Sequence, residues 1–380
     1  MTQPTFLLAP DSFKESMTAK EVCVAMEAGL RKAFPEASYI HVPMADGGEG
    51  TVQSLVDATG GKLLEKEVTG PLGQPVIAKY GIMGDGMTAA IEMASASGIQ
   101  LVTKETRNPL ITSTYGTGEL IKECLHRGIK KIIIGIGGSA TNDGGTGMAE
   151  ALGAKFLDAG GNTLPRGGGS LGELATVDIS ALDARLAEVE IIVACDVTNP
   201  LCGPTGASHI FGPQKGASPE MVLKLDASLA HYAAVVNEQL NKDVRDVPGA
   251  GAAGGLGAGL LIFTQATLQR GIDIIINYTG LREKLTSANY VLTGEGGMDA
   301  QTKFGKTPHG VAKAAKQEGK KVIALAGYIG EGAEVLYEEG IDAIFGIVPG
   351  ASDLEKLLKE GPKNVERAAE NVGRLIKLSC

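Results

Sequence analysis

The sequence lacks the cysteine spacing of disulfide-rich and metal-binding proteins. No Cys-x-x-Cys pair occurs, and the number of cysteines is odd. In a chain of 380 residues this usage is typical of a reduced protein whose cysteines are small buried side chains, so we expect a cytoplasmic protein. The cysteines are Cys23, Cys124, Cys195, Cys202 and Cys380.

The sequence also lacks clustered basic residues and long apolar segments. With a net charge of −9 and no Lys/Arg cluster, we expect no nucleic-acid partner. The longest uncharged stretch, residues 248–269, is interrupted by glycine, threonine and glutamine, which makes it a poor membrane helix. The first eleven residues have no basic segment of the kind that begins a signal peptide. We therefore expect no contact with a membrane.

Glycine, in contrast, is abundant, with 54 residues, about twice its usual share of ~7%. No Gly-X-Y period is present, which excludes a collagen-like chain. The glycines gather in short runs after apolar segments, where a backbone without side chains can approach a ligand closely.

Short β-branched runs alternate with helical patterns, which predicts an α/β protein with mainly parallel sheets. Residues 131–134 and 189–193 are too continuously apolar for strands with one wet face, so we expect both faces of these strands to be covered. The predicted strands are Thr5–Ala9, Tyr39–Pro43, Lys130–Gly137, Val189–Cys195, Asn289–Thr293, Lys320–Gly327 and Ile341–Val348.

Helix boundaries can be predicted from capping signals. Capping boxes are expected at Thr18 with Glu21 and at Ser352 with Glu355. Thr307 is expected as an N-cap, followed by a proline at the first helical position. The Gly-x-Gly-x-x-Gly match at residues 249–254 follows a proline rather than a strand. It therefore predicts the close-packed start of a helix over residues 256–268, not a dinucleotide site.

Two α/β domains are expected from the chain length and the distribution of glycine. Residues 1–70 and 286–380 resemble each other in style and predict one discontinuous, Rossmann-like domain. Residues 71–285 hold most glycine-rich loops and predict a second α/β domain inserted into the first.

Candidate site residues follow five of the predicted strands. In open parallel sheets ligands bind outside the carboxyl ends of the strands, and each of these five ends carries a carboxylate beside small residues. Such a set suggests a cleft for phosphate, metal and a polar substrate. The candidates in these loops are Ser12, Lys14, Asp46, Glu49, Gly137, Gly138, Ser139, Thr141, Asn142, Asp143, Asp196, Glu295 and Asp299.

The best candidate for a phosphate cradle is the loop Gly137–Gly145, because a strand, Gly-Gly-Ser and then a helix can point N–H groups at an anion. The alternative is a tight turn without a ligand. Lys14 and Lys215 each fit either an anion contact or a plain structural lysine. Residues 300–307 resemble a P-loop but begin with alanine, although Lys306 could still lie over a phosphate at the helix start.

The segments 9–16, 43–51, 135–145, 195–201 and 293–295 together resemble the bacterial type I glycerate kinase family, over nearly the whole chain and in the same order. The resemblance implies D-glycerate and ATP as substrates, Mg²⁺ as cofactor, a phosphoglycerate product and two α/β domains. One departure stands out: the family usually has an arginine where this chain has Gly297. We expect its role to be absent here or filled by Lys303 or Lys306.

Phosphoryl transfer needs a base, charge neutralisation and alignment of the acceptor hydroxyl. We expect Asp196 or Asp46 as the base, Lys14 as charge stabiliser and residues 137–142 as the cradle. Asp46 and Asp299 are the metal candidates. The sequence leaves open which hydroxyl is phosphorylated and what the oligomeric state is. A kinase for another hydroxy acid, or a sensor without catalysis, are the alternative functions.

Overall fold

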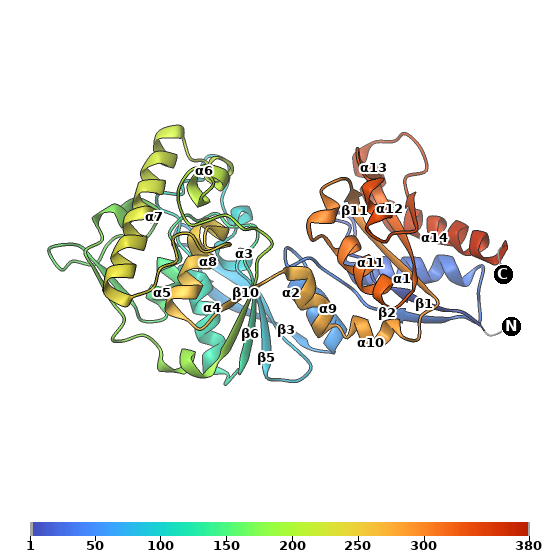
Figure 1. Cartoon of the computed structure of the whole chain (residues 1–380), viewed down its shortest axis with the longest axis horizontal. Helices are drawn as coiled ribbons and strands as arrows, with labels where there is room; N and C mark the ends of the chain where they lie inside the picture. Colours follow the sequence, from blue (N-terminus) through green and yellow to red (C-terminus); the bar gives the residue numbers. More distant parts are fainter. Residues whose placement is uncertain (1–2, 379–380) are drawn as a thin grey trace. The chain divides into compact units, whose positions relative to one another are not determined.

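A computed structural model describes residues 3–378; Met1 and Cys380, which the sequence-based expectations also cover, lie outside the described residues. The chain folds into two compact units (Figure 1). Unit 1 comprises Met1–Asp46, Gln53–Gly60 and Gly271–Cys380, and unit 2 comprises Gly47–Val52 and Gly61–Arg270. Residues 47–52, 61–70 and 271–285 thus fall on the other side of the expected boundaries, and the proposed division into domains stays a prediction.

Unit 1 contains a parallel sheet of five strands in the order β13-β12-β11-β1-β2. The parallel α/β architecture predicted for this part of the chain is confirmed. The strands are β1 (Thr5–Leu8), β2 (Ser38–His41), β11 (Tyr290–Met298), β12 (Lys321–Ile329) and β13 (Ala343–Gly346).

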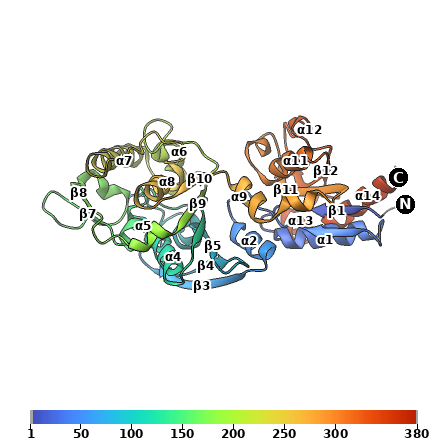
Figure 2. The same cartoon turned by 60° about the horizontal axis from the view of Figure 1, so that its bottom comes forward.

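Both faces of this sheet are buried. Phe6, Leu8 and Leu292 pack in one apolar cluster with α1 (Ala19–Arg31) and α14 (Gly361–Leu378). The alternate side chain Leu7 is also fully buried, on the face where α11 contacts β11 and β12. Figure 2 shows α11 and α12 above these strands and α1 below them.

Capping decides where several helices of unit 1 begin. The predicted capping box of Thr18 with Glu21 is present. The second one is not, because Asp353 takes the N-cap of α13 without a side-chain hydrogen bond. Thr307 is the first helical residue of α11 and not its N-cap. The remaining helices are α2 (Thr51–Thr59), α9 (Gly271–Tyr278), α10 (Leu281–Leu285), the 3₁₀ helix η5 (Thr302–Phe304), α11 (Thr307–Gln317), α12 (Val335–Glu338) and α13 (Leu354–Lys359).

Unit 2 contains a mixed sheet of six strands in the order β10-β9-β6-β5-β4-β3. Strands β10, β9, β6 and β5 are parallel, whereas β4 and β3 add an antiparallel edge. The predictions at β6 and β9 are confirmed; the other four strands were not predicted. The strands are β3 (Lys62–Thr69), β4 (Pro75–Ile82), β5 (Thr88–Glu92), β6 (Lys131–Gly135), β9 (Glu190–Ala194) and β10 (Thr267–Gln269), with a separate pair β7 (Lys155–Leu157) and β8 (Thr176–Asp178).

The helices of unit 2 pack on the continuously apolar strands. Ile132, Ile134 and Val193 lie in one cluster with residues of α4, α5 and α8. Helix α8 begins four residues before the predicted start and ends five residues before the predicted end. It includes a kink, where Ala253 has a φ of 53°. The helices are α3 (Ala94–Ser97), η1 (Ile99–Leu101), α4 (Tyr115–His126), α5 (Thr146–Ala151), η2 (Gly168–Glu173), η3 (Ala184–Glu188), α6 (Ala207–Phe211), η4 (Pro213–Lys215), α7 (Pro219–Leu240) and α8 (Ala252–Phe263). Among residues 3–378 no helix is long and apolar enough to cross a bilayer.

Candidate active site

A cavity of about 810 Å³ lies at the carboxyl-terminal edge of the unit 1 sheet. Every strand of this sheet, or the loop that follows it, contributes to its lining. This is the edge at which open parallel sheets bind ligands. The structure brings together here the predicted residues Ser12, Lys14, Asp46, Glu295 and Lys306, and it adds Asp11.

Three carboxylates face this cavity from neighbouring strands. Burial, together with the negative charge of Asp46 and Glu295, raises the pKa of Asp11 to about 7. This happens although Asp11 accepts two hydrogen bonds, from Thr307 Oγ1 at 2.5 Å and from the Ser12 N–H at 2.6 Å. The cavity therefore concentrates negative charge at the ends of β1, β2 and β11, where a cation would be stabilised.

Two lysines also line this cavity, and one of them lies beside a carboxylate. Lys306 Nζ lies 3.5 Å from Glu295 Oε2 and donates to the Gly297 carbonyl oxygen at 3.4 Å. Lys14 is exposed, and both lysines line the cavity. Of the two lysines expected near Gly297, Lys306 is therefore the one in the cavity lining. Lys303 is outside it, 5.2 Å from the Phe304 ring.

The carboxylates suit Mg²⁺, which prefers oxygen ligands. Within residues 3–378, however, no three His, Cys, Asp or Glu side chains are close enough to form a complete metal site. Mg²⁺ typically uses one or two carboxylates together with water and substrate phosphates, so the arrangement fits this ion. Asp299, the other metal candidate, is not part of the lining; its Oδ1 accepts the N–H of Gln301 in a turn.

In unit 2, the loops after β6 and β9 meet at one sheet edge, because these two strands are parallel neighbours. Gly137, Gly138 and Asp196 are exposed there. Ser139 is nearly buried and forms a bridge with Gly98. The predicted order of strand, Gly-Gly-Ser and helix is present. Helix α5 begins only at Thr146, however, so its N-terminal N–H groups do not adjoin Gly137 and Gly138.

The rest of this loop is buried and holds its own backbone in place. Asp143 is fully buried, and its carboxylate accepts hydrogen bonds from the Thr114 N–H and hydroxyl and from the N–H groups of Gly145 and Gly147. Burial nevertheless raises the pKa of Asp143. This placement favours a supporting role for Asp143 over the ligand contact that the sequence predicted.

Lys215 is buried in the same region. Its Nζ donates to the Thr141 carbonyl oxygen at 2.6 Å, and its side chain is only 1% exposed. Burial lowers the pKa of Lys215 to about 7, although the charge of Asp143 acts in the opposite direction. The Lys215 amine therefore stabilises the backbone of the loop through its hydrogen bond to Thr141. Its burial argues against the direct phosphate contact expected for Lys215.

Thr141 and Asn142 are also buried. The Asn142 side chain donates to Ser208 Oγ at 3.0 Å.

Glu49 is exposed at the start of unit 2. Its charge adds to the burial that raises the pKa of Glu92, whose carboxylate accepts the Val52 N–H.

Asp11 and Asn364 line the unit 1 cavity but were not among the predicted site residues. Asp11 could have been predicted, because it is a carboxylate in the loop after the first predicted strand, separated from that strand only by Pro10. Asn364 lies inside α14, far from any strand end, and nothing in its local sequence indicates a site.

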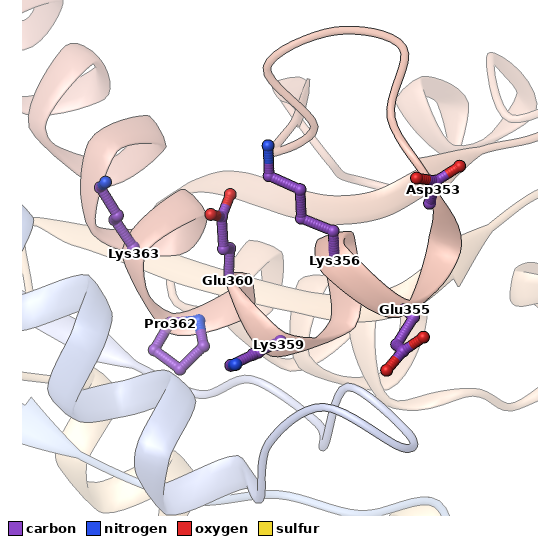
Figure 3. Close-up of a pocket in the computed structure, with 7 residues that line it drawn as sticks. All are labelled: Asp353, Glu355, Lys356, Lys359, Glu360, Pro362 and Lys363. Atoms are coloured by element: carbon purple, nitrogen blue, oxygen red, sulfur yellow. The ribbon is translucent and has the colours of Figure 1, made fainter.

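A second cavity of unit 1 is built from one continuous segment at α13 and the start of α14 (Figure 3). Acidic and basic side chains are mixed in it and point in different directions, so no group of one charge converges on a ligand. We assign it no function. Its lining residues are Asp353, Glu355, Lys356, Lys359, Glu360, Pro362 and Lys363.

Comparisons with known proteins agree with each other. A profile of the Glycerate kinase family matches residues 6–377. The chain is 54% identical to a glycerate kinase of Haemophilus influenzae and 52% identical to a glycerate 2-kinase of Escherichia coli, covering 98% of both chains in each case. It also resembles a crystal structure from Salmonella typhimurium LT2 that is provisionally named glycerate kinase 2. That match has a TM-score of 0.91 and 50% identity, and covers 100% of this chain and 99% of the other.

Proposed function

The chain belongs to the glycerate kinase family, and from this premise we propose that it transfers the γ-phosphate of ATP to the 2-hydroxyl of D-glycerate. The choice of hydroxyl follows the name of the relative from E. coli, a glycerate 2-kinase. The products are then 2-phosphoglycerate and ADP. A cytoplasmic location agrees with the free cysteines among the described residues.

The observation that carries this proposal is the charged cavity of unit 1. Phosphoryl transfer depends on positioning the phosphates and neutralising their charge, rather than on covalent chemistry by the protein. Lys14 and Lys306 supply positive charge there, and Asp11, Asp46 and Glu295 supply oxygen atoms for a cation. Both types of group are present in one cavity large enough for a nucleotide.

Asp46 and Glu295 are the residues that would hold Mg²⁺ together with the nucleotide phosphates. Bound there, the ion neutralises phosphate charge. Thr302 donates to Glu295 Oε1 at 2.8 Å and so fixes the direction of that carboxylate. Lys306, which lies 3.5 Å from Glu295 Oε2, provides a positive charge beside this carboxylate that remains when no cation is bound.

For the acceptor we propose the exposed sheet edge of unit 2. Gly137 and Gly138 have no side chains to prevent a carboxylate from reaching their N–H groups. Asp196, exposed after the neighbouring strand, is the candidate base that takes the proton of the hydroxyl. This assigns the Gly-Gly loop to the acid group of glycerate, where the sequence alone predicted a phosphate.

The test is ADP release by the purified protein with Mg²⁺, ATP and a panel of small hydroxy acids. We expect release with D-glycerate and little with L-glycerate, lactate or tartrate. A stronger response to another acid would identify a related kinase. Binding of glycerate without any ADP release would favour the sensor and refute the proposal.

A further inference from the structure

The unit 1 cavity has two chemically different halves, and the order of strands in the sheet separates them. Its charged residues lie on β11 or in the loops after β11, β1 and β2, at one side of the order β13-β12-β11-β1-β2. The lining contributed by β12, β13 and α13 is apolar. A ligand that fills the cavity must therefore carry charge at one end and an apolar group at the other.

The apolar half consists of side chains that the fold leaves exposed. Tyr328 is 67% exposed, Val348 42% and Leu354 68%, yet all three line a concave surface. Exposed apolar groups that gather in a cavity commonly mark a ligand site. These side chains contribute little to the core of unit 1, because most of their surface remains in water.

Glycines keep this half of the cavity open. Gly346 does not have a positive φ, and a Cβ atom there would make only an ordinary contact of 3.6 Å with Ile329 Cδ1. Gly297 lies on β11 but pairs with Tyr328 of the apolar half, and an added Cβ there would lie 3.9 Å from Tyr328 Cδ1, again without a positive φ. Neither backbone strain nor internal packing therefore requires glycine at these positions. A larger side chain there would occupy part of the cavity.

A polar side chain without a partner lies in the same lining. Asn364 is only 5% exposed, and its amide makes no hydrogen bond with the part of the chain that the structure describes. Ser16, also in the lining, already donates to the Leu358 carbonyl oxygen at 2.6 Å. The Asn364 amide is not among the fully buried polar groups that lack a partner, so its atoms are accessible from the cavity that Asn364 lines, where a ligand can bind them.

We propose that the adenine ring of ATP binds against Tyr328, Val348 and Leu354 and that Asn364 recognises its polar edge. An asparagine amide has one acceptor and a donor group, which match the amino group and the adjacent ring nitrogen of adenine. The triphosphate then extends along the strand order toward Lys306 and Lys14. This inference rests on the proposed use of ATP and adds the residues that select the base.

Calorimetric titration with ADP and with inorganic pyrophosphate, both with Mg²⁺, tests the subsite. Leu354→Ser removes apolar contact, and Asn364→Leu keeps the volume but removes the amide. We expect each to weaken ADP binding about tenfold while pyrophosphate, which has no base, binds as before. Leu223→Ser, at a residue of similar exposure outside the cavity, should change neither affinity.

Unchanged ADP affinity in Leu354→Ser and Asn364→Leu would overturn the subsite, and so would an equal loss for ADP and pyrophosphate. Leu354 is mostly exposed, so its variant should fold even if Asn364→Leu does not. Because the titration contains no glycerate, its result is independent of turnover. Glycerate phosphorylation with unchanged ADP binding in the variants would refute the subsite alone. Selective loss of ADP binding without glycerate turnover in the wild type would refute the proposed reaction alone.

Discussion

At the scale of single residues, a base for the acceptor hydroxyl has to be accessible and held by a rigid element. Asp196 is exposed directly after β9, whose side chains Ile191 and Val193 are buried. We expect Asp196→Asn to lower kcat by roughly 10²–10⁴-fold, because the amide cannot accept the proton. The thermal unfolding midpoint should stay within about 2 °C of the wild type, since an exposed substitution of equal size rarely affects stability.

Asp46→Asn is the matched comparison, because the same change is made in the unit 1 cavity. We expect a higher Mg²⁺ requirement, with turnover largely restored at saturating metal. A near wild-type rate in Asp196→Asn, together with an uncorrectable loss in Asp46→Asn, would move the role of base to Asp46.

Lys215 makes stability depend on pH. Burial lowers its pKa in the folded protein to about 7, below the usual value of 10.5 that applies after unfolding. Between these values the unfolded chain binds the extra proton, so the folded state loses stability as the pH falls from 10.5 to 7. From pH 9 to pH 7 we expect a loss of about 2 kcal/mol in the free energy of unfolding relative to Lys215→Met.

Urea unfolding of the wild type and of Lys215→Met at pH 7, 8 and 9 measures this difference, because all other titrating groups are shared. Lys104→Met removes an exposed lysine and should show the pH dependence of the wild type. Parallel curves for the wild type and Lys215→Met would contradict the burial of this amine in its neutral form.

At the scale of elements, β6 and β9 could be predicted because they are continuously apolar and mostly buried. Residues 131–134 predict a buried strand because three β-branched isoleucines follow one another without a polar residue between them. Strand β3 could not be predicted in this way. Its sequence Lys-Leu-Leu-Glu-Lys-Glu-Val-Thr is charged and mostly exposed, and only pairing with β4 makes it a strand. Edge strands of this kind depend on tertiary contacts more than on local pattern.

The loop between β6 and α5 offers a test of the acceptor site. Gly137 is exposed without a positive φ, and an added Cβ would lie 3.7 Å from Gly48 Cα. Gly137→Val should therefore fold normally but raise the KM for D-glycerate about tenfold or more, because a side chain hinders access to the N–H groups. ADP binding should be unchanged.

Gly138→Val is the contrasting variant. Gly138 has a φ of 74°, which a β-branched residue adopts only with strain, so this variant should also unfold at a lower temperature. An unchanged KM for D-glycerate in well-folded Gly137→Val would remove the loop from the acceptor site.

At the scale of the whole molecule, the sequence predicted candidates at strand ends, such as Lys14 and Glu295, and these two line the unit 1 cavity. It could not show that Asp143 and Lys215 are buried, because their burial depends on contacts between distant segments, such as the hydrogen bond between Lys215 and Thr141, 74 residues apart. Nor could it predict Asn364, which is brought to the cavity by a helix at the other end of the chain. Strand order, which local patterns do not contain, decides which loops become neighbours.

Phosphorus NMR of the product tests the central claim most directly. Purified protein is incubated with ATP, Mg²⁺ and D-glycerate, and the new phosphate ester is observed with proton coupling. Phosphate on the 2-hydroxyl is next to a carbon that bears a single hydrogen, so we predict a doublet that grows in step with ADP. A triplet, which a neighbouring CH₂ group would give, would place the phosphate on the 3-hydroxyl, and the absence of an ester signal would contradict glycerate phosphorylation altogether.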